Sequence, residues 1–261
     1  MATLPNPLPK LAADPSGSSL GLELPVGSLI DVTADGPADE PLLWCAGEAA
    51  RPGGWAALRA ARGAGLLPVL LDVDGGHGGP QEWELSPYEL SYPGDHDADE
   101  VLADFWEAYA SEGDEWPGLA EALTLVADPD ARAVEVADSL AGGGSWLKDP
   151  RLALVPARRS ADIPAAIGWM GAANHENDTA LLCAVLRSWE DRFGIRVVAL
   201  GFDRLVLSVA APPATLEEAE EIAAEHFAFC PDNITQGHHE TLRAYARHEV
   251  LDRQVWSFWW D

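Results

Sequence analysis

Positive charge is scarce in this sequence of 261 residues. The chain has 16 Lys and Arg residues against 43 Asp and Glu residues, which gives a formal net charge of −27 at pH 7. Nucleic acids and anionic membrane surfaces are bound mainly through clusters of Lys and Arg, and the sequence contains no such cluster. The composition therefore argues against a nucleic-acid or membrane-surface role. It remains compatible with a cationic protein partner or a bound cation.

The excess of acid is unevenly distributed along the chain. Residues 1–150 carry 27 Asp and Glu against 6 Lys and Arg, whereas residues 151–261 carry 16 against 10. Charge asymmetry of this kind is typical of an interaction surface. We therefore expect the acidic first part to present a surface that complements a cationic partner.

Long apolar runs and paired cysteines are also lacking. No apolar run approaches the ~20 residues that a membrane helix needs, and the first residues do not resemble a signal peptide. Cys45, Cys183 and Cys230 are odd in number and far apart, which is not the pattern of a disulfide framework. These features predict a cytoplasmic protein with reduced thiols.

Several common catalytic motifs are absent as well. The sequence contains no phosphate-binding loop, no G-x-S-x-G elbow, no H-E-x-x-H and no C-x-x-C. Their absence favours a protein without catalytic activity, although it leaves the question of an enzyme open.

In the first part of the chain, two apolar runs flank a short helical pattern. Residues 41–46 and 66–72 read as buried strands, and the segment between them reads as a helix. This order predicts a βαβ-like unit in an acidic α/β region that covers residues 1–140. Further helices are expected over 98–110 and from Pro117.

A long polar segment over residues 72–97 is rich in Gly and Pro. It is either a functional loop or a mobile insertion. Asp72, Asp74 and His77 match only a fragment of a calcium-loop pattern, so an acidic, solvated loop is the preferred interpretation.

Gly-rich residues 141–150 read as a linker to a second domain over residues 151–261. Periodicity in that domain predicts a strand, a helix, a two-stranded hairpin, two helices and a final strand. The corresponding ranges are 151–156, 177–194, 195–200 with 205–210, a helix from Thr215, 239–251 and 255–261. The expected fold is α+β, with an antiparallel or mixed sheet covered by helices.

The helix from Thr215 begins with the capping-box pair Thr215 and Glu218. Helical spacing places His226 and Cys230 on its inward apolar face. The same spacing places Glu225, with the other glutamates of the helix, away from that face.

Several separated motifs of the second domain match a known family in order. They are IPAAIGWMGAAN, VLRSWEDRFGIRVVALGFDRLVLSVAAPP, AAEHFAFCPDNITQG and the terminal WSFWWD. On these residues the region from about 150 to 261 resembles the DUF4253 family, a bacterial domain of unknown function. The resemblance implies no assigned reaction.

Four residues form a candidate metal site. His226 and Cys230 lie four residues apart on one helix, a spacing at which two side chains can bind one metal ion, and His238 and His239 follow a short loop. Zinc or another divalent metal is the implied cofactor. The alternative is a buried, hydrogen-bonded histidine beside a small apolar cysteine, in which case no cofactor is expected.

Three residues are candidates for binding a partner. Arg187 and Arg192 lie on the charged face of their helix, where ordinary surface ion pairs are the alternative. In the final strand, alternation places Trp256, Phe258 and Trp260 on the covered face and Trp259 on the other.

The leading hypothesis is a non-catalytic protein-interaction or regulatory module, such as an immunity-like protein. One alternative is a metal-dependent enzyme that uses the His and Cys residues. The other is a small-molecule binding domain that uses the terminal tryptophans.

Overall fold

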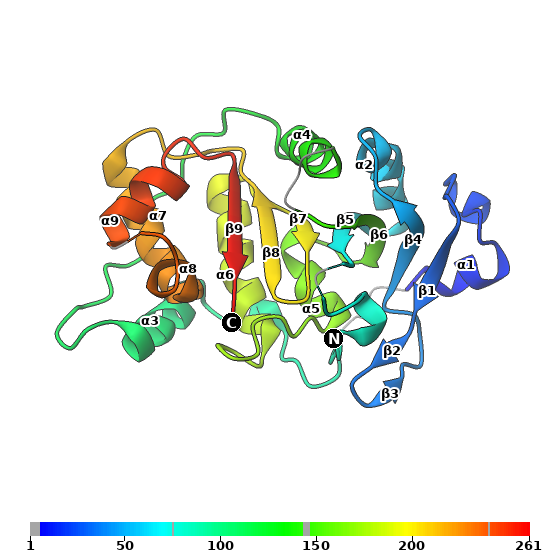
Figure 1. Cartoon of the computed structure of the whole chain (residues 1–261), viewed down its shortest axis with the longest axis horizontal. Helices are drawn as coiled ribbons and strands as arrows, with labels where there is room; N and C mark the ends of the chain where they lie inside the picture. Colours follow the sequence, from blue (N-terminus) through cyan, green and yellow to red (C-terminus); the bar gives the residue numbers. More distant parts are fainter. Residues whose placement is uncertain (1–5, 75, 143–146, 240) are drawn as a thin grey trace.

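A single large sheet crosses the molecule from β9 to β1 (Figure 1). The computed structural model describes residues 6–74, 76–142, 147–239 and 241–261. In them the seven strands have the order β1-β4-β6-β5-β7-β8-β9. Their bounds are β1 Gly27–Ile30, β4 Leu43–Ala49, β5 Leu66–Asp72, β6 Pro150–Pro156, β7 Arg196–Leu200, β8 Arg204–Ser208 and β9 Val255–Trp259. A separate ribbon pairs β2 (Val32–Thr33) with β3 (Gly36–Pro37).

Neighbouring strands of the large sheet are antiparallel except for β5 and β7, which are parallel. The sheet is therefore mixed, and helices cover both of its faces. The α-helices are α1 Pro9–Ala13, α2 Gly54–Ala57, α3 Ala98–Tyr109, α4 Pro129–Ala141, α5 Ile163–Ile167, α6 Thr179–Phe193, α7 Leu216–Phe229, α8 Asp232–Thr235 and α9 Leu242–Tyr245. The 3₁₀ helices are η1 Ser18–Leu20, η2 Leu58–Ala64, η3 Pro80–Glu82, η4 Pro93–Asp95 and η5 Ser160–Asp162, and η6 Ala246–Val250 is a π-helix. These elements confirm the α+β class.

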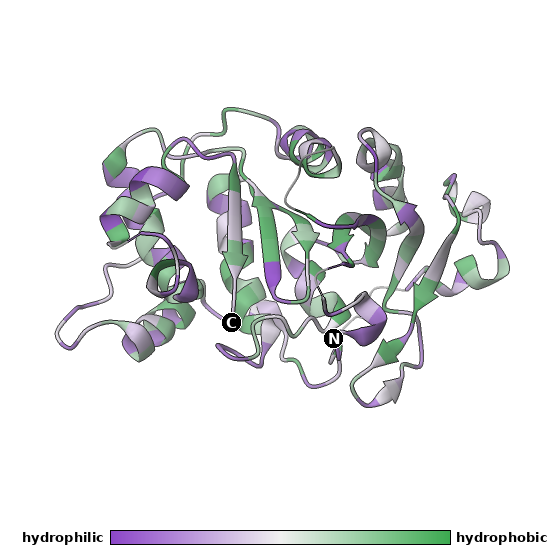
Figure 2. Cartoon of the chain, viewed as in Figure 1, coloured by the Kyte–Doolittle hydropathy of each residue, from purple (hydrophilic) through white to green (hydrophobic). Residues whose placement is uncertain are grey.

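Two apolar cores lie on the two faces of the sheet. Helices α3, α5, α6 and α7 contribute to the larger core, together with Trp83 and Leu85 from the segment after β5. Helices α1, α2 and α4 contribute to the smaller core. Figure 2 shows hydrophobic colouring along the central strands and hydrophilic colouring on the outer turns of the helices. Burial of both faces explains why the central strands are apolar throughout.

The predicted βαβ-like unit forms, but a third strand lies within it. Strands β4 and β5 both pair antiparallel with β6, so β4 and β5 are parallel to each other with β6 between them. Strand β6 comes from the region predicted as the second domain. The predicted regions 1–140 and 151–261 thus share one sheet, and residues 143–146 of the predicted linker lie outside the described residues.

Three strands of the sheet end on the same side. Strand β7 is parallel to β5, and β9 is parallel to β7 because both are antiparallel to β8. The carboxyl ends of β5, β7 and β9 therefore lie on the same side of the sheet, and the residues that follow these strands leave the sheet there. We call this side the common edge. Ligand sites of open α/β sheets lie outside the carboxyl ends of parallel strands.

The helix expected from Pro117 was a wrong prediction, because residues 116–126 are not helical. Gly118 has a φ of 87°, in the left-handed region, which interrupts a helix at its first turn. Backbone hydrogen bonds to other elements then hold the segment: Leu123 N–H donates to Arg192 O at 3.1 Å, and Val126 N–H donates to Ala210 O at 3.0 Å.

Helix α4 was not predicted, although Asp128 caps it and Pro129 is its first residue. The final strand agrees with its prediction, since Trp256, Phe258 and Trp260 are 2%, 0% and 2% exposed. No helix formed by the described residues is long and apolar enough to cross a bilayer.

Candidate functional site

His226 lies in the core and not at a surface site. Its Nδ1 is 3.1 Å from the Tyr245 hydroxyl, and the Trp256 and Phe258 rings pack against it at centroid distances of 4.6 and 4.9 Å. The side chain is fully buried, and this burial lowers the pKa of His226 to about 3. The imidazole is therefore neutral at physiological pH.

Cys230 follows α7 directly and is also fully buried. Its Sγ is 3.0 Å from Trp259 O, to which the thiol donates. Burial raises the pKa of Cys230 to about 12. The thiol is therefore protonated at neutral pH, whereas metal binding and nucleophilic attack require a thiolate.

The structure does not bring the four predicted metal ligands together. His239 Nε2 is 2.8 Å from Glu249 Oε1, and its ring stacks on His248. The Tyr245 ring contacts both His226 and His239, and His238 is exposed. Among the described residues, no group of three or more His, Cys, Asp or Glu side chains is arranged to hold a metal ion.

Arg187 is engaged in an ion pair with η5. Its Nε and Nη2 atoms donate to the two carboxylate oxygens of Asp162 at 2.5 and 2.9 Å, and its guanidinium lies over the Tyr92 ring. The hydrogen bond to Asp162 raises the pKa of Arg187. The bidentate geometry fixes the side chain, and a binding role for Arg187 stays a prediction.

Arg192 forms a buried ion pair with Glu225, which corrects the prediction that Glu225 faces solvent. Glu225 is 0% exposed, and its oxygens accept hydrogen bonds from Arg192 Nη1 at 2.7 Å and Nη2 at 2.6 Å. Trp189 Nε1 and the backbone N–H of Ala120 donate to the same carboxylate. Helical spacing could not reveal these partners, because they lie on α6 and on the segment that contains Ala120. A binding role for Arg192 likewise stays a prediction.

Trp259 is half-buried and points towards the turn after β7. Its Nε1 donates to Asp203 Oδ2 at 3.0 Å. This places the end of β9 beside the end of β7, at the common edge of the sheet.

A pocket of about 490 Å³ opens at this edge. Phe202 and Asp203 follow β7, Trp260 and Asp261 follow β9, and the segment after β5 supplies a further wall. The described residues that line it are Ala34, His77, Trp83, Glu84, Ser86, Met170, Gly171, Ala173, Asn174, Phe202, Asp203, Trp260 and Asp261. We call this site the acidic pocket.

The acidic pocket combines carboxylates with aromatic rings. Glu84, Asp203 and Asp261 carry its negative charge, and none of the described lining residues is Lys or Arg. Arg204, the next residue after Asp203, forms an ion pair with it at 3.8 Å while remaining half-exposed. Although Arg204 pairs with Asp203, Glu84 and Asp261 leave the lining with a net negative charge, which favours a cation.

Two further features lie in the lining of the pocket. The rings of His77 and Phe202 stack at 4.0 Å between centroids. The Nε1 atom of Trp260 is buried and has no hydrogen-bond partner among the described residues. A buried N–H without an acceptor is rare in proteins, and Trp256 Nε1 is a second such atom of the same segment.

Glu84 has a strained backbone within this wall. Its φ is 53°, in the left-handed region that residues other than glycine seldom adopt. The neighbouring contacts hold it there: Leu85 O accepts from Ala34 N at 2.9 Å, and Ser86 N donates to Gly168 O at 2.7 Å. Such strain concentrates at functional sites.

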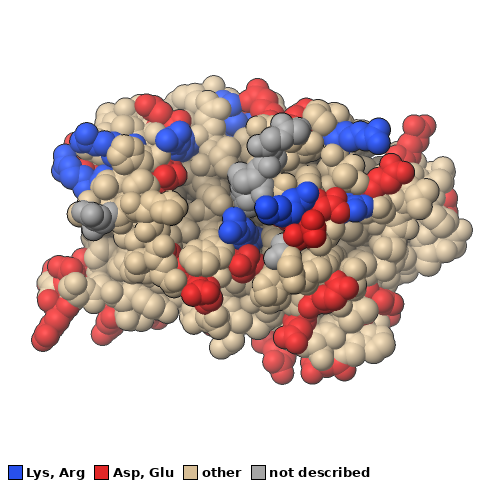
Figure 3. Space-filling model, in the orientation of Figure 1, with Lys and Arg blue, Asp and Glu red and all other residues tan. Residues whose placement is uncertain are grey.

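Exposed acidic side chains are also frequent on the segments that precede and follow the lining residues Ala34 and Glu84. The residues of this acidic surface are Asp31, Asp35, Asp39, Glu40, Asp74, Glu82, Glu84, Glu89, Asp95, Asp97 and Asp261. No Lys or Arg occurs between Arg62 and Arg132 in the sequence. In Figure 3 red side chains lie along the lower part of the visible face, where no blue side chain is seen and where Figure 1 places β2, β3 and α3, whereas the upper part shows red and blue side chains together.

Sequence reasoning identified only part of this site. It singled out Trp259, and it predicted that residues 72–97 form either a functional loop or an insertion. It named Trp260 only among the terminal tryptophans of the small-molecule-binding alternative, and it did not identify Glu84 or Asp203, which lie on separate segments. The signals present in the sequence were the long stretch without Lys or Arg and the short polar turn directly after β7.

Comparison with protein families gives one match. Residues 151–261 match the family model described as a domain of unknown function, DUF4253. No curated protein and no solved structure matches the chain. The matched region supplies Asp203 and Trp260 to the acidic pocket, whereas His77 and Glu84 lie before it.

Proposed function

We propose that this protein is a non-catalytic protein-interaction module that binds a cationic segment of a partner protein at the acidic pocket. The observation that carries the proposal is the combination of three carboxylates, aromatic rings and no Lys or Arg in one lining. The partner would insert an Arg or Lys side chain into the pocket. Its flanking basic residues would contact the acidic surface.

The physical chemistry of the lining favours this occupant. Carboxylates attract a cationic side chain, and the faces of Trp and Phe rings stabilise a cation further. Long-range attraction by the acidic surface would accelerate association and make it depend on salt.

A regulatory or immunity-like role is consistent with such a module, because blocking a basic partner requires binding alone. The three cysteines of the chain are free and buried, which supports a cytoplasmic location as part of the proposal. Trp259 belongs to the proposed contact region, since it holds Asp203 in place.

A peptide titration tests the proposal. The probes are a short fluorescein-labelled peptide of alternating Arg and Ser and a matched peptide of alternating Glu and Ser. We expect saturable binding of the first peptide, measured by fluorescence anisotropy, and weaker binding as salt increases. Binding of neither peptide, or equal binding of both, would overturn the proposal.

Two substitutions separate the pocket from the general negative charge. The double variant Glu84→Gln with Asp203→Asn keeps the oxygen acceptor towards Trp259 and removes two charges. It should lower the affinity for the Arg peptide about fivefold or more. The matched control is Glu217→Gln together with Glu107→Gln, at exposed positions outside the pocket. Equal losses in the two double variants would show that only net charge matters.

A further inference from the structure

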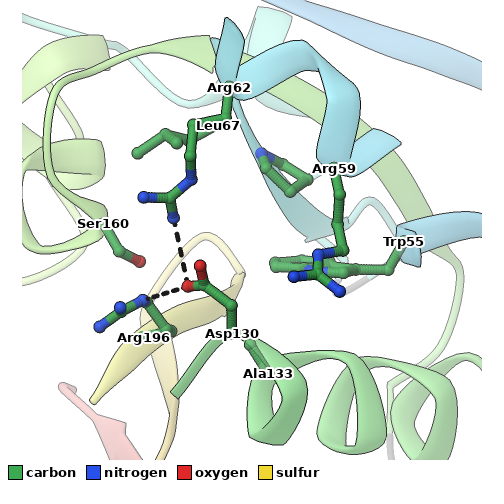
Figure 4. Close-up of a pocket in the computed structure, with 9 residues that line it drawn as sticks. Trp55, Arg59, Arg62, Leu67, Asp130, Ala133, Ser160 and Arg196 are labelled. Atoms are coloured by element: carbon green, nitrogen blue, oxygen red, sulfur yellow. Dashed lines mark hydrogen bonds and ion pairs between the residues drawn. The ribbon is translucent and has the colours of Figure 1, made fainter. Parts of the chain in front are cut away.

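A second, smaller pocket lies at the opposite end of the β5–β7 pair. Leu67 and Pro68 line it at the start of β5, and Arg196 lines it at the start of β7. The other described lining residues are Trp55, Arg59, Arg62, Asp130, Ala133 and Ser160. The cavity has a volume of about 110 Å³. Its walls come from α2, η2, α4 and η5 as well as from the two strands (Figure 4).

This pocket has the opposite charge to the acidic pocket. Three arginines and one aspartate line it, so their formal charges give a net of about +2 if all four are ionised. Arg196 Nε is 2.7 Å and Arg62 Nη2 is 3.2 Å from Asp130 Oδ1. Three of the 16 basic residues of a strongly acidic chain thus meet at one cavity.

The electrostatic field of the arginines acts on Asp130. Partial burial alone would raise the pKa of Asp130, but the hydrogen bond from Arg196 and the charges of Arg196, Arg62 and Arg59 lower it overall. The carboxylate is therefore ionised at neutral pH. Arg196 also pairs with a second carboxylate, since its Nη1 is 3.5 Å from Glu190 Oε1. Asp130 and Glu190 together offset two of the three guanidinium charges, so the cavity retains a net positive charge.

Two donors of the pocket remain available for a ligand. Among the described residues, Arg59 has no hydrogen-bond or ion-pair partner, and Figure 4 shows it beside the Trp55 ring, across the cavity from Arg196. The Ser160 Oγ accepts from Val197 N at 2.8 Å, and the side chain is buried. Because its oxygen already accepts this bond, the Ser160 hydroxyl hydrogen is left to donate into the pocket.

We propose that this pocket binds a phosphate group in its dianionic form. The net positive charge of the site favours an anion, and guanidinium groups donate pairs of hydrogen bonds to phosphate oxygens. The volume exceeds the ~30 Å³ that one water takes in the liquid several-fold. It is well below the ~300–1,000 Å³ of a pocket for a drug-sized ligand. A phosphate group alone enters the cavity, either as the free ion or as the end of a phosphate monoester.

The proposal does not depend on the cationic partner of the acidic pocket. Different residues line the two sites, and the sites lie at opposite ends of the same strands. A failure of one proposal leaves the other unaffected.

Isothermal titration calorimetry of the full chain with inorganic phosphate tests the proposal, with sulfate, acetate and glycerol 3-phosphate as comparison ligands at matched ionic strength. We expect phosphate and sulfate to bind and acetate to bind at least about tenfold more weakly.

Tighter binding of glycerol 3-phosphate than of phosphate would identify a monoester as the source. Tighter binding of phosphate would identify the free ion. Phosphate affinity should fall below pH ~6, where a phosphate group becomes a monoanion.

Variants provide the second part of the test. Arg59→Gln and Arg62→Gln should each lower phosphate affinity about tenfold, while the exposed Arg247→Gln should not change it. Asp130→Asn should raise phosphate affinity, since it keeps one oxygen acceptor for the arginines and removes a like charge. Equal phosphate affinity in the parent, Arg59→Gln and Arg62→Gln would overturn the proposal, as would acetate binding as tightly as phosphate.

Discussion

The most consequential single contact in the core is the ion pair between Arg192 and Glu225. Glu225 is completely buried, and Arg192 supplies two of the four hydrogen bonds that its carboxylate accepts. Replacing Arg192 by Met leaves a buried charge without its countercharge, which costs about 3–5 kcal/mol. We expect this loss in the free energy of unfolding, measured by urea denaturation at neutral pH.

The control for this prediction removes both charges. The double variant Arg192→Met with Glu225→Gln should recover a large part of the loss, since no unpaired charge remains. A double variant that is less stable than Arg192→Met alone would contradict this account of the pair.

His226 gives the protein a defined sensitivity to acid. The unfolded chain protonates His226 below pH ~6.5, whereas the native state resists protonation until the pKa of about 3 that burial imposes. The unfolded state therefore binds the extra proton in this window, and the free energy of unfolding decreases as pH falls from 6.5 towards 3. The limiting slope for this residue is about 1.4 kcal/mol per pH unit.

Urea denaturation at several pH values below neutrality measures this slope. His226→Gln should lose less stability on acidification than the parent, whatever its stability at pH 7. His175, whose pKa burial lowers to about 4, acts in the same direction in both proteins. The exposed His248→Gln should keep the slope of the parent. Identical slopes in the parent and His226→Gln would refute the prediction.

These residues show where sequence reasoning succeeds and where it fails. The inward position of His226 and Cys230 followed from helical spacing, because one apolar face determines it. The burial of Glu225 could not follow from spacing. A glutamate is buried only when partners compensate its charge, and these partners come from α6 and from residue 120.

At the scale of elements, β9 depends on its aromatic residues. This strand pairs with β8 alone among the described strands, so hydrogen bonds hold it on one side only. Trp256 packs against Trp189, Phe193 and His226. Trp256→Ala should therefore lower the free energy of unfolding by about 3–5 kcal/mol. Val255→Ala, at a neighbouring exposed position, should cost less than about 1 kcal/mol by the same urea denaturation.

Besides the backbone of Gly118, tertiary hydrogen bonds explain why the helix expected from Pro117 is absent. Residues 116–126 carry apolar residues at helical spacing. Their backbone, however, forms hydrogen bonds with α6, with Ala210 beyond the end of β8, and with Glu225. Those acceptors and donors exist only in the folded molecule, so a local pattern cannot report them. The central strands β5, β7 and β8 were predicted well because they lie in a sheet buried on both faces and are apolar over most of their length.

At the scale of the whole molecule, the two pockets give the sheet opposite charge at its two ends. The acidic pocket follows β5, β7 and β9, and the arginine-lined pocket precedes β5 and β7. Each lining draws on segments far apart in the chain, so neither pocket was predictable from spacing. The charge asymmetry along the sequence indicated an acidic interaction surface. It did not indicate that Arg59, Arg62 and Arg196 lie together at the second pocket.

The sheet also determines whether residues 151–261 can fold alone. In the complete chain β6 lies between β4 and β5, and β5 lies between β6 and β7. A fragment of residues 147–261 lacks β4 and β5, so β6 loses both neighbours and β7 loses one. The fragment also leaves the backbone hydrogen-bonding groups of the apolar strands β6 and β7 unpaired and exposed. We expect this fragment alone to show no cooperative unfolding transition in circular dichroism. Co-expression with residues 1–142 should restore one, because the two pieces supply all seven strands. A cooperative transition in the fragment alone would instead establish residues 151–261 as an autonomous domain.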